Sequence, residues 1–77
     1  MSPTVLRARN LSVRFYPKDH NPPHVHVIGP DAEAKFRLGD FECIYSRGFS
    51  PRALKSIKSF LKERKILLME VWNEYQE

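Results

Sequence analysis

The chain has 77 residues, carries a formal net charge of +4, and 42% of its residues are hydrophobic. This length predicts one small domain over residues 1–77, which would bury only about 60% of the surface that the unfolded chain exposes. Cys43 is the only cysteine, so a disulfide within the chain is excluded, and no apolar run is long enough to span a bilayer. We therefore expect a cytoplasmic protein that does not enter membranes.

Alternating apolar and polar residues predict an antiparallel sheet in the first half of the chain. The expected strands cover residues 4–8, 11–16, 24–28 and 33–38. The sequence Gly29-Pro30-Asp31 is typical of a turn between the last two strands. One face of this sheet should be apolar and the other polar.

Ser50 and Pro51 predict the start of a helix, because serine is a favoured N-cap and proline suits the first helical position. No glycine or proline interrupts the chain after Pro51, so we predict one helix over residues 51–75 that covers the apolar face of the sheet. Residues 41–46 fit either a short helix capped by Asp40 or an edge strand, and the short helix is preferred. The expected fold is α+β, with a small antiparallel β-meander of three to four strands packed on one long C-terminal α-helix.

The predicted helix is longer than the strands it would cover. It would extend ~37 Å, whereas a six-residue strand spans only ~20 Å. Its end should therefore project beyond the sheet and bind a partner protein or a second copy of the chain. Scattered surface hydrophobic residues are the alternative interpretation. The predicted partner-binding residues are Ile66, Met69, Trp72 and Tyr75.

A proline-rich segment contains all three histidines of the chain: His20, His24 and His26. Pro22 and Pro23 fix their own φ angles and restrict the residue before them, so the turn should be rigid. The two histidines that follow lie two residues apart on a strand and should both point to the polar face. Asp19 and the first histidine lie across the turn.

Basic residues are concentrated in two parts of the chain. Four precede Asp19 without any acidic residue, and residues 47–65 contain seven against Glu63 alone. Such a charge distribution attracts nucleic acid or an acidic protein partner. Ordinary solubility is the alternative explanation.

The polar face of the sheet suggests a site that binds or cleaves RNA. Histidines titrate near neutral pH, so His24 and His26 could form an acid–base pair, with Asp19 orienting one imidazole. The neighbouring cations could hold a phosphate and an aromatic ring could stack on a base. The predicted nucleic-acid-binding residues are Arg14, Tyr16, Lys35 and Arg37. The chain is on this interpretation a candidate small endoribonuclease.

Two other interpretations of the histidines stay open. His20, His24 and His26 could bind zinc, although the surrounding arginines and lysines repel a cation, and no cofactor is otherwise expected. Alternatively, the imidazoles could donate to backbone carbonyls left unpaired by the proline turn. The chain would then be a non-enzymatic protein-interaction module with structural histidines.

Residues 15–26 carry the pattern F-Y-x-x-D-H-x-P-P-H-V-H, which resembles the bacterial family named domain of unknown function 4160. Residues 3–6, 34–36, 47–50 and 72–75 are also similar to that family. The family is similar to components of toxin–antitoxin-type modules, in which a small basic protein is encoded beside a small acidic one. The resemblance implies a bacterial toxin–antitoxin component that binds an acidic protein partner.

Overall fold

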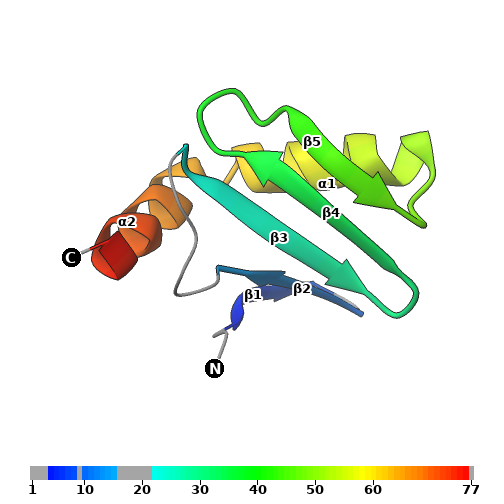
Figure 1. Cartoon of the computed structure of the whole chain (residues 1–77), viewed down its shortest axis with the longest axis horizontal. Coiled ribbons are helices and arrows are strands. Elements are labelled where there is room, and N and C mark those ends of the chain that lie inside the picture. Colours follow the sequence, from blue (N-terminus) through cyan, green and yellow to red (C-terminus); the bar gives the residue numbers. More distant parts are fainter. Residues whose placement is uncertain (1–3, 9, 16–21, 77) are drawn as a thin grey trace.

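A computed structural model describes residues 4–8, 10–15 and 22–76, without the side chains of residues 4, 5, 75 and 76. These residues form an α+β fold, as predicted, with five strands and two helices (Figure 1). The elements are β1 (Thr4–Ala8), β2 (Leu11–Arg14), β3 (His24–Gly29), β4 (Ala32–Arg37), β5 (Cys43–Arg47), α1 (Pro51–Lys62) and α2 (Lys65–Gln76).

The five strands form one sheet in which each strand pairs antiparallel with the next along the chain. The predicted meander is therefore confirmed, with one strand more than expected. The additional strand is β5, so the short helix preferred for residues 41–46 is wrong and the edge-strand alternative is correct. Phe41 adopts a left-handed φ of 58°, which a continuing α-helix cannot contain. β5 then pairs with β4, and a register shift leaves Ile44 as an extra residue between two paired ones.

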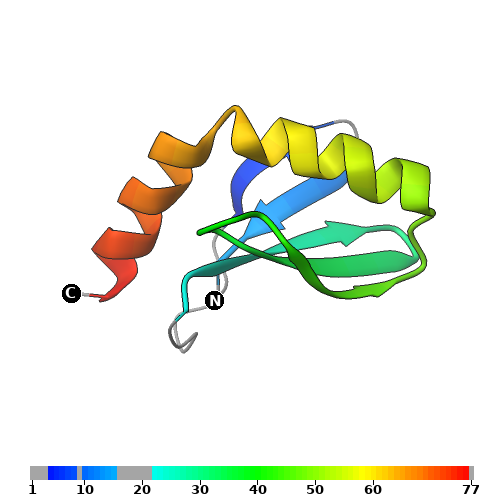
Figure 2. The same cartoon turned by 90° about the horizontal axis from the view of Figure 1, so that it is seen from above.

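The inner face of the sheet forms the hydrophobic core with α1. Val13, Val27 and Ala34 are cross-strand neighbours in one row, and each is at most 2% exposed. Ile57 and Leu61 of α1 belong to the same buried cluster. Figure 2 shows α1 lying across this face. The start of α1 is as predicted, because the Ser50 hydroxyl accepts a hydrogen bond from the Ala53 backbone N–H at 3.1 Å.

The C-terminal helix is interrupted at Glu63 and Arg64, contrary to the single helix predicted over residues 51–75. The Arg64 backbone N–H donates to the Leu61 carbonyl at 2.9 Å, an i−3 bond typical of a helix end. The Phe60 carbonyl instead accepts a bond from the Arg64 guanidinium at 3.0 Å. The guanidinium also lies 3.8 Å from the centre of the Phe60 ring. One side chain thus ends α1 without glycine or proline.

Because of this break, α2 turns away from α1 and lies at the end of the sheet where β3 begins (Figures 1 and 2). α2 buries Leu68 and Trp72, which are 0% and 2% exposed. The Trp72 ring packs edge-to-face on Phe15, with ring centroids 5.7 Å apart. The projecting helix end was therefore predicted wrongly, and Trp72 is a core residue rather than an exposed partner-binding one.

Candidate nucleic-acid interface

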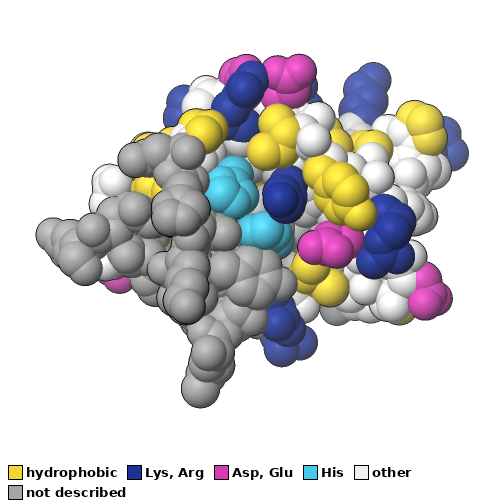
Figure 3. Space-filling view, viewed as in Figure 1, with side chains coloured by type: hydrophobic (Ala, Val, Ile, Leu, Met, Phe, Trp, Pro, Cys, Tyr) yellow, Lys and Arg dark blue, Asp and Glu magenta, His cyan; other side chains and the backbone are white. Residues whose placement is uncertain are grey.

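The antiparallel register places basic and histidine residues side by side on the outer face of the sheet. Arg14 pairs with His26, and His26 pairs with Lys35 on the next strand. Lys35 pairs in turn with Tyr45 of β5. We call these four residues the outer-face row. Figure 3 shows the described histidine side chains on this face, which is opposite α1, next to side chains of Lys or Arg.

His24 lies beside this row and is held by the proline turn. Its ring centroid is 5.2 Å from that of His26, with the two rings at 67°. Its Nδ1 atom is 3.0 Å from the Pro22 carbonyl oxygen. Because a carbonyl only accepts hydrogen bonds, the tautomer that satisfies this contact has its proton on Nδ1. The predicted bond from a histidine to a carbonyl of the proline turn is confirmed for this residue.

His26 is the most buried polar side chain of the described face, at 6% exposure. Its two neighbours in the row, Arg14 and Lys35, are half-buried cations. The row itself contains no carboxylate, and Glu33, the acidic residue on the same face of β4, lies 3.8 Å from Arg47. The cations of the row favour a bound anion. A phosphate group suits this arrangement better than a metal ion does.

Arg37 was predicted to bind nucleic acid, but its guanidinium pairs with two carboxylates. The distances are 2.7 Å to Asp40 and 2.6 Å to Glu42. The hydrogen bond from Arg37 holds the pKa of Asp40 well below its usual range, and the Glu42 backbone N–H contributes in the same direction. The same interaction raises the pKa of Arg37. The local charge around this guanidinium is compensated, so Arg14 and Lys35 are the cations on which a phosphate site depends.

Three of the predicted site residues lie outside the described residues: Tyr16, Asp19 and His20. The proposed orientation of an imidazole by Asp19 stays a prediction for that reason. The zinc ligand set included His20 and stays a prediction as well. Within the part of the chain that the structure describes, no group of three His, Cys, Asp or Glu residues could hold a metal ion.

Tyr45 is a residue of this face that the sequence analysis did not identify. It stands beside Lys35 at the end of the outer-face row, and its side chain is 44% exposed. An exposed ring beside a cation is the arrangement on which a nucleic-acid base can stack. The alternation of Cys43 and Tyr45 was the available signal, and the interpretation of residues 41–46 as a helix concealed it.

The predicted partner-binding residues on α2 do not share one surface. Ile66 is 78% exposed, as expected of a residue that meets a partner, and its neighbour Leu67 is 43% exposed. Met69 is half-buried against the core, whereas Trp72 lies inside it. The side chain of Tyr75 lies outside the described part of the structure.

The fold and the outer face define a small α+β protein with a histidine-containing, cation-flanked sheet surface. The chain belongs to the family described as domain of unknown function (DUF4160), whose sequence profile matches residues 10–73. No curated protein and no solved structure matches the chain significantly. Among the described residues, no helix combines the length and the apolar character needed to cross a membrane.

Proposed function

We propose that the chain binds single-stranded RNA on the outer face of its sheet, where His24 and His26 act on the RNA backbone as an acid–base pair. The observation that carries this proposal is the outer-face row, in which antiparallel pairing sets a buried histidine between two cations. Phosphate contacts from Arg14 and Lys35 would position the RNA. Tyr45 would stack on a base exposed by an unpaired strand.

The two histidines suit the cleavage of an RNA chain at its 2′-hydroxyl. His24 is assigned as the base because its Nδ1–H is directed to Pro22, which leaves the lone pair on Nε2. Nε2 accepts the 2′-hydroxyl proton while O2′ attacks the adjacent phosphorus. The P–O5′ bond breaks, and protonated His26 donates its proton to O5′. The products are a 2′,3′-cyclic phosphate and a 5′-hydroxyl end.

We further propose that the protein acts in the bacterial cytoplasm as a toxin–antitoxin-type component controlled by an acidic protein partner. The net charge of +4 supports an acidic partner, because opposite charges steer association and fix its orientation. RNA cleavage would supply the toxic activity. Pairing with the partner would suppress it.

A second candidate function is a non-enzymatic protein-interaction module with structural histidines. It is supported by the His24 bond to the Pro22 carbonyl and by the position of the His24 ring 5.6 Å from that of Trp72. Both contacts are those of a residue that shapes a turn and joins a core. This candidate requires neither RNA nor the cations of the outer-face row.

Binding is tested by fluorescence anisotropy with an unstructured RNA of uniform sequence. We expect binding that weakens with salt, and we expect Lys35→Ala to reduce the slope of log K against log salt by about 0.7, the value for one contact with a single strand. Lys55→Ala on α1 removes the same charge from a position remote from the row and should leave the slope unchanged. Equal effects of the two variants would contradict binding at this face.

Catalysis is tested by product analysis and by growth after induced expression. We expect the parent to release 2′,3′-cyclic phosphate ends and to slow growth, and we expect the His24→Gln, His26→Gln double variant to do neither. Glutamine retains hydrogen-bonding capacity, and circular dichroism establishes that the variant is folded. If that folded variant slows growth as much as the parent, the histidines are structural and the second candidate holds.

A further inference from the structure

The sheet is wider than the helix that covers its inner face. Five strands spaced about 4.8 Å apart span about 19 Å, whereas a helix with its side chains is about 10 Å wide. In Figure 1, α1 lies behind β4 and β5, and neither described helix lies behind β1 and β2. α2 does not fill this space, because it is turned to the end of the sheet (Figure 2). Neither described helix therefore covers the inner face beside β1 and β2, although Val13 and Val27 there are already buried by neighbouring side chains.

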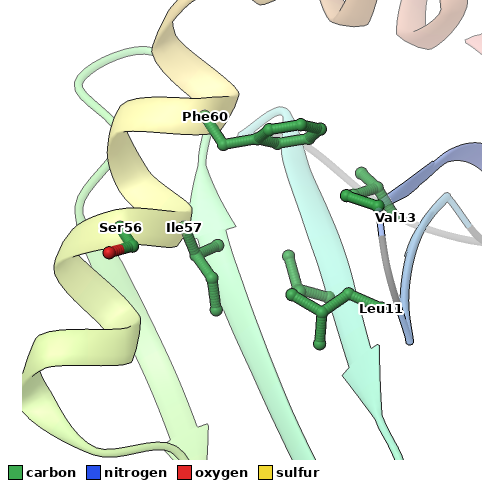
Figure 4. Close-up of a pocket in the computed structure, with 7 residues that line it drawn as sticks. Leu11, Val13, Ser56, Ile57 and Phe60 are labelled. Atoms are coloured by element: carbon green, nitrogen blue, oxygen red, sulfur yellow. The ribbon is translucent and has the colours of Figure 1, made fainter.

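A groove lies in this uncovered half, between α1 and the hairpin formed by β1 and β2. Its walls are Ile57 and Phe60 on one side and Leu11 and Val13 on the other, with Val27 between them. Figure 4 shows the helix residues and the hairpin residues facing each other across the opening. The groove encloses a cavity of about 300 Å³. It is lined almost entirely by apolar side chains.

The groove continues toward the N-terminal end of α1 and becomes basic there. A second cavity of about 410 Å³ shares Leu11, Ser56 and Ile57 with the first one and is also lined by Arg52. At the other end, the Arg64 guanidinium lies over the Phe60 ring, but it lines neither cavity and is paired with Glu63 at 3.5 Å. Among the described residues, none that lines either cavity is acidic. An apolar floor with the Arg52 side chain at one end is complementary to an amphipathic helix that carries acidic side chains.

We propose that this groove binds an amphipathic, acidic helix of a partner protein, which lies beside α1 as the second helix on the inner face. Its apolar residues at i, i+3, i+4 and i+7 would enter the groove, and its carboxylates would meet Arg52. The existence of such a partner rests on the proposed function, whereas its docking place does not use the outer face. Partner and RNA would bind on opposite sides of the sheet, so the partner would suppress RNA cleavage through the strands that separate the two faces, without covering the outer face.

The proposal is tested with a phage-displayed library of helices of about 18 residues, or five turns, with leucine at the groove-facing positions and Glu, Lys or Ser elsewhere. Glu-rich helices should be enriched on the folded parent protein. Ser56→Tyr fills the groove from an exposed position. We expect it to reduce the affinity for the selected helix at least about tenfold. Ser59→Tyr places the same ring on an exposed position of α1 that lines neither cavity, and should change affinity less than about twofold.

Other outcomes would overturn the proposal. Enrichment of Lys-rich helices, no enrichment at all, or equal effects of Ser56→Tyr and Ser59→Tyr would each exclude an acidic helix in this groove. If the groove is covered by a second copy of the chain, sedimentation will show a parent dimer that Ser56→Tyr converts to a monomer. If the parent protein binds no RNA but still selects Glu-rich helices, only the proposed function is contradicted.

Discussion

The imidazole ring of His24 lies with its centroid 5.6 Å from that of the Trp72 indole, tilted by 52°. Trp72 also packs on Phe15, so its ring connects the hydrophobic core to the histidine of the proline turn. His24 contacts His26 on its other side. The last helix therefore contacts the candidate site through Trp72.

Replacing Trp72 should destabilise the protein and displace His24. We expect Trp72→Ala to lower the free energy of unfolding by about 3–5 kcal/mol, as for other large buried aromatic residues. Trp72→Phe keeps a ring against the histidine and should cost less, which preserves a folded variant for study. Asn73→Ala, at an exposed position of the same helix, is the control, with a change of at most about 0.5 kcal/mol. A denaturation midpoint shared by Trp72→Ala and Asn73→Ala would contradict this role.

Arg64 should stabilise the junction of the two helices. Arg64→Ala removes the hydrogen bond to the Phe60 carbonyl and the contact with the Phe60 ring, and should cost about 1–2 kcal/mol in urea unfolding. Arg64→Lys keeps the charge but loses the planar group, so it should recover only part of this stability. Lys65→Ala removes an adjacent exposed cation and serves as the control. The assignment fails if both alanine variants unfold at the same urea concentration.

Gly48 is required where β5 ends close to the turn between β3 and β4. Its φ is 85°, and a Cβ there would lie 2.9 Å from the Ala32 Cβ and against the Asp31 carbonyl oxygen. Gly48→Ala should therefore cost about 2–4 kcal/mol, from the left-handed backbone and the collision together. Gly39→Ala meets no atom within 4 Å and should change stability by less than about 1 kcal/mol. Similar melting temperatures for the two variants would show that this contact is not restrictive.

Stability should decrease in acid through Asp40. The hydrogen bond from Arg37 lowers the pKa of Asp40 in the folded protein, so the unfolded chain binds a proton there first as the pH falls. This contribution is complete above the ordinary carboxyl pKa of about 3.9 and is lost as the pH falls from there toward the folded-state pKa. The stability difference between the parent and Asp40→Asn should thus shrink below about pH 4 and in high salt. Asp31→Asn controls for the loss of one carboxylate, and a difference independent of pH would contradict this assignment.

The sheet was predictable because its strands alternate between a buried and an exposed face. Val25 and Val27 enter the core, whereas His24 and His26 point to the opposite side, as a two-residue period requires. The helix cap was predictable because it depends only on the local sequence Ser50-Pro51. The structure shows the expected hydrogen bond from the Ala53 N–H to the Ser50 hydroxyl. The side of the sheet on which the described histidines lie was therefore predicted correctly.

The break between α1 and α2 was not predictable in the same way. Apolar residues recur at helical spacing both before and after Arg64, so the pattern gives no sign of a break. The interruption depends on the Arg64 guanidinium reaching the Phe60 carbonyl. The burial of Trp72 depends on that break, so the exposed surface predicted for the helix end failed with it. Tyr45 was missed because its place beside Lys35 is set by the pairing of β5 with β4, which joins residues that are not neighbours in sequence.

The central claim is that RNA contacts the imidazoles of His24 and His26 on the outer face. It is tested most directly by NMR of the protein with its histidine rings labelled with ¹³C, titrated with unstructured RNA. Assignments come from the variants His24→Gln and His26→Gln. We predict that the ring signals of both residues shift and saturate together with RNA binding measured by anisotropy. If RNA binds while both ring signals stay unchanged, the outer face is not the RNA site and the account is wrong.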